Sequence, residues 1–328
     1  MISVVLFGLG RVGSRNAAKP GLETLSHVGA ILAAGGFELL GMVDPDGDAR
    51  RSAAELWAGR KVGRIVADVK SIGVAAADVA VVAGSTSARE AQIAAALTLR
   101  PKVLLIEKPL ATTAGGAGRL AALVEGAGAR LRVNFNRRFD PGHLEIKRGL
   151  VGVPRKAVMR YGKGLRNYGS HMIDLLLDWF GPIDQVQAFG APPTDDGPLD
   201  FRCRMKAGFD AVIIGMDGLD YDQFEIDFFY ADRRIELADG GVAKRRYDPI
   251  DGRVYPGYVH LDDVPTTLHR GAVGGFVETY GAIKDHLTGG SPLGGCGAVD
   301  AVAGLAVIDA ALRSAALDGA PVTPVVQI

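Results

Sequence analysis

A lysine follows the abrupt end of an apolar run near the middle of the chain, at Glu107-Lys108-Pro109. The four residues before it, 103–106, are all apolar, and a run without alternation is typical of a strand buried on both faces of a parallel sheet. Ligands bind at the carboxyl ends of such strands, so Lys108 would face a ligand cleft. Pro109 fixes one backbone dihedral and leaves its peptide bond, cis or trans, open. The alternative is an ordinary strand end with a surface ion pair.

A second candidate site lies at the start of the chain, where the apolar run 2–7 leads into Gly8-Leu9-Gly10-Arg11-Val12-Gly13. In a GxGxxG turn the first glycine allows a tight turn, the second lets backbone approach a pyrophosphate, and the third lets a helix pack closely. The amides at the start of that helix would then face phosphate. Glycine-rich strand ends also occur without a cofactor in a chain with 45 glycines. The predicted dinucleotide contacts are Gly8, Gly10, Arg11, Val12 and Gly13.

An acidic residue, Asp44, ends the next predicted strand, 37–43. A carboxylate there can accept hydrogen bonds from ribose hydroxyls and repels a 2′-phosphate, which favours NAD over NADP. Asp44 lies 31 residues beyond Gly13, where about 20 are usual. We therefore expect Lys19-Pro20-Gly21 to interrupt the first crossover and to add a second helix. Arg50 and Arg51 follow closely and could hold a phosphate, so NADP stays possible.

Strands that alternate with helices predict a doubly wound parallel sheet over the first part of the chain. The apolar run 77–83 ends in Gly84-Ser85-Thr86-Ser87, small polar residues that let a cofactor approach. Ser87 is expected to cap the helix that follows. Ser85 and Thr86 join Glu107 and Lys108 as predicted cofactor contacts.

Beyond about residue 150 the pattern changes to short alternating strands. Phe224, Ile226 and Phe228 alternate with Glu225 and Asp227, as in a half-exposed antiparallel strand. We predict a dinucleotide-binding Rossmann domain over 1–130, with a C-terminal helix at 297–317 packing back on it. Residues 131–328 are predicted to form a substrate-binding and oligomerisation α+β domain with a large, mainly antiparallel, open-faced sheet. The segment 247–267 is expected to be irregular.

Composition excludes several classes of partner. The 328 residues include 37 basic and 37 acidic side chains, so no global field favours nucleic acid or an anionic membrane. Two cysteines far apart in the sequence suit a reducing cytoplasm. The apolar runs are strand-sized, which argues against a membrane span. No His, Cys and carboxylate residues have metal-ligand spacing, so no metal is predicted.

The motifs together resemble the Gfo/Idh/MocA family of NAD(P)-dependent oxidoreductases. They are the early GxGxxG, Asp44, the EKP at 107–109, and the segment 134–139 followed by Pro141. The resemblance covers nearly the whole chain, since the segment 275–289 and the alanine-rich helix from about residue 297 also fit. It implies that Lys108 lies near nicotinamide and substrate, and that a histidine of the second domain serves as acid/base.

That histidine is sought in the segment 167–175, which resembles the family's D-x-G-x-H-x-x-D with Asn167 in place of the first aspartate. The resemblance implies His171 as the acid/base; a structural histidine at a helix start is the alternative. A neutral amide cannot accept a proton, but Asn167 can hydrogen-bond substrate hydroxyls. Arg138 is a further candidate for orienting substrate. Members of the family commonly pair their sheets, which implies a homodimer or homotetramer.

The implied activity is hydride transfer between nicotinamide and a polyhydroxylated substrate, such as a sugar, a cyclitol or a sugar derivative. The expected catalytic residues are Lys108, His171 and Asn167, and the expected substrate contacts are Lys108, Arg138, Asn167 and His171. Two alternatives stay open: a catalytically silent NAD-binding sensor of the same fold, and a redox-neutral enzyme with tightly held NAD. Retention of both Lys108 and His171 disfavours the sensor.

Overall fold

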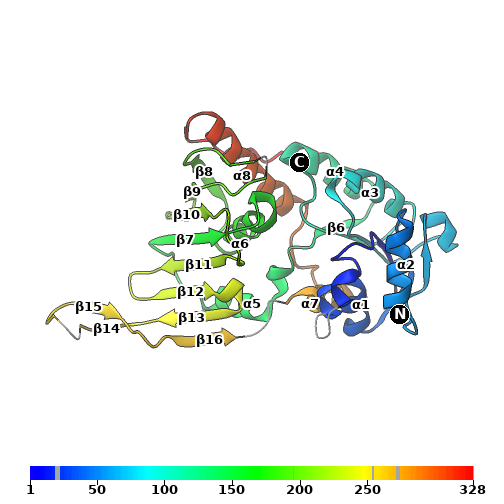
Figure 1. The fold of residues 1–328 in the computed structure, drawn as a ribbon, viewed down its shortest axis with the longest axis horizontal. Helices are drawn as coiled ribbons and strands as arrows, with labels where there is room; N and C mark the ends of the chain where they lie inside the picture. The colour runs from blue at the N-terminus through cyan, green and yellow to red at the C-terminus, as the bar shows by residue number, and fades with distance from the viewer. Residues whose placement is uncertain (19–22, 195, 253–254, 271–273, 328) are drawn as a thin grey trace. The chain divides into compact units, whose positions relative to one another are not determined.

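The chain forms two compact units in a computed structural model, which describes residues 1–18, 23–194, 196–252, 255–270 and 274–327 (Figure 1). Unit 1 comprises Met1–Phe139, Gly274–Val302 and the two C-terminal residues. Unit 2 comprises Asp140–Val273 and Ala303–Val326. The last helix, α8 (Ala298–Ala316), begins in unit 1 and continues in unit 2.

Unit 1 is built on a six-stranded sheet in the order β3-β2-β1-β4-β5-β6, and all its pairs are parallel. The central strands β4 and β5 are buried on both faces, as their unbroken apolar runs predict. The predicted doubly wound parallel sheet is thus confirmed. The strands are β1 (Ile2–Phe7), β2 (Phe37–Val43), β3 (Arg64–Val66), β4 (Val79–Val82), β5 (Val103–Ile106) and β6 (Arg130–Val133).

Helices join these strands, and side-chain caps set where three of the α-helices begin. Ser26, Asp46 and Thr113 each accept a hydrogen bond from a first-turn amide, which satisfies a donor that the helix itself leaves free. The helices of unit 1 are η1 (Arg15–Ala18), η2 (Glu23–Leu25), α1 (His27–Ala34), α2 (Gly47–Leu56), η3 (Val69–Ile72), η4 (Thr86–Ala88), α3 (Arg89–Leu97), α4 (Ala114–Gly126), η5 (Asn136–Phe139) and α7 (Phe276–Gly289).

Helix α7, far along the chain, completes the core beside β1 and α1. Its Tyr280 and Ile283 are buried in the same apolar cluster as Val4 and Leu6 of β1. The Tyr280 ring also packs edge-on against Phe37, with 5.6 Å between ring centroids. The return of the chain at 274–302 therefore belongs to the fold of unit 1.

Unit 2 is built on an eight-stranded sheet in the order β16-β13-β12-β11-β7-β10-β9-β8. Of the strand pairs described in this sheet, only β7–β10 is parallel, so the prediction of a mainly antiparallel sheet is confirmed. The strands are β7 (Lys156–Tyr161), β8 (Ile183–Ala188), β9 (Phe201–Met205), β10 (Asp210–Gly215), β11 (Phe224–Phe229), β12 (Arg234–Ala238), β13 (Ala243–Tyr247) and β16 (Thr266–Arg270).

One face of this sheet is covered by helix α6 (Ser170–Phe180). Trp179 packs on Phe228 and Phe180 on Phe209, with ring centroids 5.7 and 5.0 Å apart. Large aromatic side chains bury much apolar area in such contacts. The other helices of unit 2 are α5 (Pro141–Gly149), the π-helical turn η6 (Leu165–Gly169) and η7 (Asp239–Gly241).

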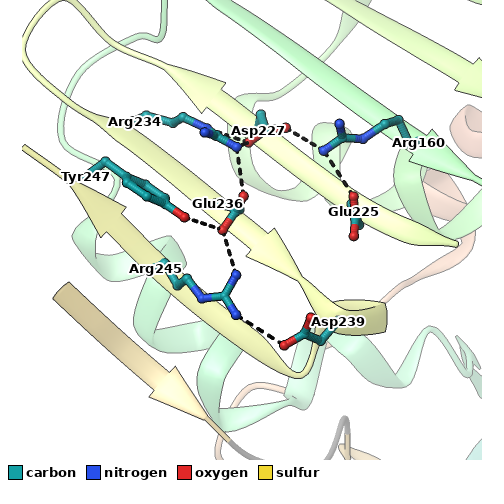
Figure 2. A network of polar contacts seen from close by, with 8 residues as sticks. All are labelled: Arg160, Glu225, Asp227, Arg234, Glu236, Asp239, Arg245 and Tyr247. Carbon is teal, nitrogen blue, oxygen red and sulfur yellow. Dashed lines mark hydrogen bonds and ion pairs between the residues drawn. The ribbon is translucent and has the colours of Figure 1, made fainter. Parts of the chain in front are cut away.

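The other face carries a ladder of ion pairs across β7, β11, β12 and β13 (Figure 2). Asp227 was expected on an exposed polar face, but its side chain is only 4% exposed. Arg160 and Arg234 both pair with it, at 2.8 and 2.6 Å, and their stems cover it. Alternation in the sequence identifies the two faces of a strand, but it does not show how far neighbouring side chains cover the polar one.

The expectation of an irregular segment over 247–267 was wrong. A hairpin of β14 (Pro249–Asp251) and β15 (Val259–Leu261) lies there, and β16 begins at Thr266. The hairpin extends beyond the ends of β13 and β16 (Figure 1). Most of its side chains are exposed, so no buried face imposes the alternation by which strands are recognised in a sequence.

Candidate cofactor and catalytic site

The loops that follow β1 and β4 touch at the centre of the parallel sheet. Gly8 has φ +94°, and a Cβ there would lie 2.4 Å from the backbone nitrogen of Gly84. A Cβ on Gly13 would lie 2.0 Å from the carbonyl oxygen of Gly8. Gly10, in contrast, faces open space, since a Cβ there would meet no described atom within 4 Å. The first and third glycines therefore close the turn, and the second leaves room for a ligand.

The helix expected directly after this loop is interrupted. The Ser14 amide donates to the Gly10 carbonyl at 3.0 Å, which closes one turn before the chain departs. Helix α1 resumes at His27, whose amide donates to the Val12 carbonyl at 2.9 Å. Residues 14–26 are thus an insert, and without it the spacing from Gly13 to Asp44 would be about the usual 20. Lys19-Pro20-Gly21, predicted to interrupt the crossover, lies outside the described residues.

Asp44 ties the end of β2 to the glycine loop. Its two carboxylate oxygens accept hydrogen bonds from the amides of Leu9, at 2.7 Å, and Asp46, at 2.9 Å. Each oxygen keeps a second lone pair, so the carboxylate can still accept from a ligand hydroxyl. The guanidinium of Arg50 donates to the backbone carbonyls of Asp44 and Pro45, at 2.8 Å each. This arginine is therefore engaged by the loop itself.

The neighbouring Arg51 forms an ion pair with Asp48 on the surface. Both arginines that the sequence offered as phosphate ligands thus already have partners within the protein.

The loop after β4 carries the predicted contacts Ser85 and Thr86, and the hydroxyls of Ser85 and Ser87 lie 3.0 Å apart. Ser87 was expected to cap the following helix, but α3 begins after Ala88 without a side-chain cap, so that prediction was wrong.

Glu107 lies directly after β5, is 8% exposed, and precedes a Lys108–Pro109 peptide bond that is cis. Its Oε1 lies 3.0 Å from Nε2 of His27 and accepts from Nδ2 of Asn134 at 2.6 Å. Burial acts to raise the pKa of Glu107, but the hydrogen bonds from His27 and Asn134 and the charge of Lys108 outweigh it, so the pKa is lowered. Glu107 is therefore an ionised carboxylate within the core.

Two groups that the sequence did not single out complete this cluster. Nδ1 of His27 lies 2.8 Å from the hydroxyl of Tyr280. Burial, together with the charge of Glu107, raises the pKa of Tyr280 well above its ordinary value, so the phenol keeps its proton. Because the ionised carboxylate of Glu107 can only accept, the Nε2 of His27 carries the proton that lies between them. A histidine within the apolar stretch 27–34 was the only sequence signal of this chain of hydrogen bonds.

Arg89, at the start of α3, is a buried cation near the same strand ends. It is 2% exposed and donates to the carbonyl of Val82 at 3.1 Å. Burial lowers the pKa of its guanidinium to about 10, while the charge of Glu107 acts to raise it.

Arg138, predicted to orient substrate, has a side chain that is 6% exposed and pairs with Asp300 at 3.2 Å. Within unit 1 it is therefore held by a carboxylate.

The remaining candidates, Asn167 and His171, lie in unit 2. Asn167 is half-buried in the π-helical turn η6, where its backbone carbonyl oxygen accepts a hydrogen bond from the hydroxyl of Ser170 at 2.8 Å. Such turns are frequent at functional sites. His171 lies in the first turn of α6, is 8% exposed, and packs edge-on against Phe224 with 6.5 Å between ring centroids. Asn167 and His171 therefore come from adjoining turns of one segment.

Among the residues that the structure describes, no cluster of three or more His, Cys, Asp and Glu side chains could hold a metal ion. Both cysteines, Cys203 and Cys296, are buried free thiols. Within the same described ranges, no helix combines the length and the apolar character needed to cross a membrane.

Comparison with known proteins shows which family the first part of the chain resembles. Residues 2–135 match the model of the oxidoreductase family Gfo/Idh/MocA, described as an NAD-binding Rossmann fold. This part of the chain resembles the NAD-binding domain of that family. The match contains all the strands of the parallel sheet, the glycine loop, Asp44 and Glu107-Lys108.

Among curated proteins, inositol 2-dehydrogenase of Acidothermus cellulolyticus is 32% identical over 159 residues, which are 47% of this chain and 42% of that protein. The chain thus spans less than half the length of this relative. Among solved structures, the WlbA dehydrogenase of Bordetella pertussis, in complex with NADH and UDP-GlcNAcA, is 20% identical with a TM-score of 0.75. A super-repressor mutant of Gal80p from Saccharomyces cerevisiae is 16% identical with a TM-score of 0.77. The alignment with the WlbA dehydrogenase covers 99% of this chain and 98% of that protein. The alignment with Gal80p covers 98% of this chain and 97% of that protein. The fold of these proteins therefore extends over both units of this chain.

Proposed function

We propose that the chain is an NAD-dependent dehydrogenase or reductase acting on the CH–OH group of a polyhydroxylated substrate, a sugar, a cyclitol or a sugar derivative. The observation that carries the proposal is the closed glycine turn at the β1 and β4 strand ends, with Lys108 following β5 in the same parallel sheet. The inositol dehydrogenase relatives support a cyclitol as substrate. In this proposal 1–130 is the dinucleotide-binding domain and 131–328 the substrate-binding domain.

The residues present fit a dinucleotide. Gly8 and Gly13 admit no side chain, whereas Gly10 leaves open space on the loop. The proposed contacts are the backbone of Gly8, Gly10, Arg11, Val12 and Gly13, with Asp44, Ser85, Thr86, Glu107 and Lys108. When bound, NAD supplies a hydride acceptor at its nicotinamide ring.

The carboxylate of Asp44 would accept hydrogen bonds from ribose hydroxyls and disfavour a 2′-phosphate, so NAD is the proposed cofactor rather than NADP. The engagement of Arg50 by two loop carbonyls and of Arg51 by Asp48 supports this preference, because both guanidinium groups already have partners within the protein.

Proton transfer is assigned to Lys108 and His171. His171 takes the proton of the substrate hydroxyl as general base, and Lys108 stabilises the developing alkoxide. Asn167 and Arg138 orient the substrate by hydrogen bonds. Because Asn167 is a neutral amide, it binds hydroxyls without taking up a proton.

We also propose that the chain is a cytoplasmic homodimer or homotetramer that associates through the sheet of unit 2. The supporting feature is the broad face on which three arginines and four carboxylates neutralise one another (Figure 2), so the face carries little net charge to repel a second copy. Light scattering coupled to size exclusion should give two or four copies, and a monomer at micromolar concentration would contradict it.

The function is tested by following NADH formation with a panel of inositols, hexoses and nucleotide sugars. We expect at least one polyol to reduce NAD, and Lys108→Ala and His171→Ala to lower kcat by about 10²- to 10⁴-fold with little change in NAD affinity. Lys102→Ala and His260→Ala, which alter exposed side chains, are the matched controls. Binding of NAD without turnover of any substrate would favour the silent sensor instead.

A further inference from the structure

We propose that the hairpin of β14 and β15 is an arm that docks on a basic patch of a second copy of this chain. The arm is the segment 248–264, and the basic patch is the loop 147–156, which leads into β7, together with Phe229 at the end of β11. The inference rests on the self-association proposed above and not on the proposed activity. It adds a contact at one end of the sheet to the contact through the face shown in Figure 2.

The arm carries apolar side chains that are exposed in the single chain. Tyr255, Tyr258, Val259 and Val264 are between 63% and 74% exposed, and the centroids of the two tyrosine rings lie 5.9 Å apart. The arm extends past the ends of β13 and β16 as a two-stranded hairpin (Figure 1), and such a hairpin by itself is marginally stable in water. Exposed groups of apolar side chains mark interaction sites, so the arm requires a surface that covers it.

The arm is also acidic. It contains four aspartates and one arginine, which gives a formal net charge of −3 with its histidine neutral. Asp248 pairs with Arg246 at 2.7 Å, whereas Asp251, at the end of β14, forms no ion pair with any described residue. The surface that covers the arm must therefore combine apolar and positively charged side chains.

The basic patch combines them. The loop 147–156 contains no acidic residue and four basic ones, Lys147, Arg148, Arg155 and Lys156. Lys147 pairs with Asp178 at 2.8 Å, and the other three are exposed and form no ion pair with any described residue. Between them, Val151 and Val153 are also exposed.

Hydrogen bonds hold the basic patch in place. The amide of Arg155 donates to the backbone carbonyl of Phe229 at 2.6 Å. The guanidinium of Arg233 donates to the carbonyl of Val151, also at 2.6 Å. The patch is therefore formed before the arm arrives, and little conformational freedom is lost when it is covered.

The arm and the basic patch lie at the same end of the sheet. Tyr247, the last residue of β13 before the arm, is opposite Arg234 of β12, and the same row continues through Phe229 of β11 to Lys156 of β7. Three strand spacings separate Tyr247 from Lys156, about 14 Å in all. Five extended residues span about 16 Å, so the arm is long enough to cover a patch of this width.

The arm and the basic patch are opposite in charge, and both are apolar in part. A two-fold axis at this end of the sheet brings the arm of each copy onto the patch of the other. Such a contact requires both complementary halves on one surface of the same chain, and this end of the sheet provides them. The two copies thus make two identical arm–patch contacts.

Cross-linking between two different variants of the full chain tests the docking. One variant carries Tyr258→Cys in the arm and the other carries Val153→Cys in the patch, while both native cysteines are buried. The variants are incubated together and treated with a short bismaleimide. We expect a covalent dimer in the mixture and none with either variant alone. No cross-link in the mixture, or equal cross-linking of Tyr258→Cys alone through arm–arm pairing, would overturn the inference.

Charge reversal tests the complementarity. Asp251→Lys reverses a charge of the arm, and Arg155→Glu reverses a charge of the patch. Each substitution acts at two symmetric contacts, so each should raise the Kd of the dimer about tenfold at low ionic strength, measured by sedimentation equilibrium. Both substitutions in one chain should restore most of the affinity. Asp220→Lys, at the opposite end of the sheet, is the matched control and should leave the Kd unchanged.

An unchanged Kd in either reversal would overturn the inference and leave the association through the face of the sheet standing. A wild-type chain that is monomeric at micromolar concentration would contradict both. If circular dichroism shows Arg155→Glu to be unfolded, Lys156→Glu takes its place with the same expectation. A dimer that behaves as expected but reduces no substrate with NAD would support the inference while refuting the proposed activity.

Discussion

Arg234 is expected to stabilise unit 2 more than any exposed ion pair, because it separates two carboxylates that face each other across the sheet. Asp227 and Glu236 are directly opposite in the β11–β12 register, and their side chains are only 4% and 12% exposed. Arg234 donates to both at 2.7 Å (Figure 2). Like charges directly opposite one another destabilise a sheet.

The substitution Arg234→Met keeps the apolar stem and removes the charge. It breaks two hydrogen bonds to charged groups, each worth about 1.5 kcal/mol net. Asp227 keeps Arg160 and Glu236 keeps Arg245, so we expect a total loss of about 2 to 3 kcal/mol rather than the full cost of an isolated buried charge.

Urea unfolding followed by tryptophan fluorescence measures this loss. In a Trp57→Phe background the remaining Trp179 packs on Phe228, the neighbour of Asp227 in β11, and so reports on this sheet. Arg51→Met is the matched control, since its pair with Asp48 is exposed and should contribute less than about 0.5 kcal/mol. Equal shifts of the unfolding midpoint in both variants would refute the reasoning.

The stability of Arg234→Met should also depend on pH differently from that of the wild-type chain. Burial acts to raise the pKa of Glu236, but hydrogen bonds from Arg245 and Tyr247 and the charge of Arg234 lower it below its ordinary value. The stability that Glu236 contributes is therefore present above its unfolded pKa of about 4.3 and is lost as the pH falls through the lower folded value. In Arg234→Met the folded pKa rises, so this loss should begin at a higher pH.

Two further predictions concern the cofactor loop. Gly13→Ala should abolish NADH binding in a fluorescence titration, because its Cβ would meet the Gly8 carbonyl oxygen at 2.0 Å; Gly115→Ala, where no described atom lies within 4 Å, should bind normally, and equal affinity in both would contradict the loop geometry. Asp44→Ser should narrow the preference for NAD(H) over NADP(H) in the same titration, and a wild-type preference for NADP(H) would mean that Arg50 or Arg51 dominates.

The parallel sheet was predictable because strands buried on both faces have unbroken apolar sequences, such as 103–106, which is followed by polar residues. The glycine loop was predictable for another reason, since its three glycines fall within six consecutive residues directly after a strand. An interrupted crossover followed by a second helix was also expected, but the contact by which α1 rejoins the loop was not, because the hydrogen bond from His27 to Val12 is a tertiary contact.

The cluster behind Lys108 could not be read from the sequence for the same reason. His27 meets Glu107 across 80 residues of chain and Tyr280 across 253. Nothing local distinguishes His27 from an isolated polar residue in an apolar helix. Helix α5 was also missed, although Asp140 and Pro141 supply a cap and a first residue that mark a helix start.

The most direct measurement of the central claim is the fate of the hydrogen on the reacting carbon. Inositol deuterated at its carbinol carbons, or whichever polyol reacts fastest in the panel, is incubated with NAD and the wild-type chain, and the nucleotide is analysed by mass spectrometry. A dehydrogenase of the proposed type transfers the deuterium to the nicotinamide ring, and Lys108→Ala slows that transfer. Unlabelled nucleotide from every polyol, or deuterium that returns to a product of unchanged oxidation state, would contradict the claim.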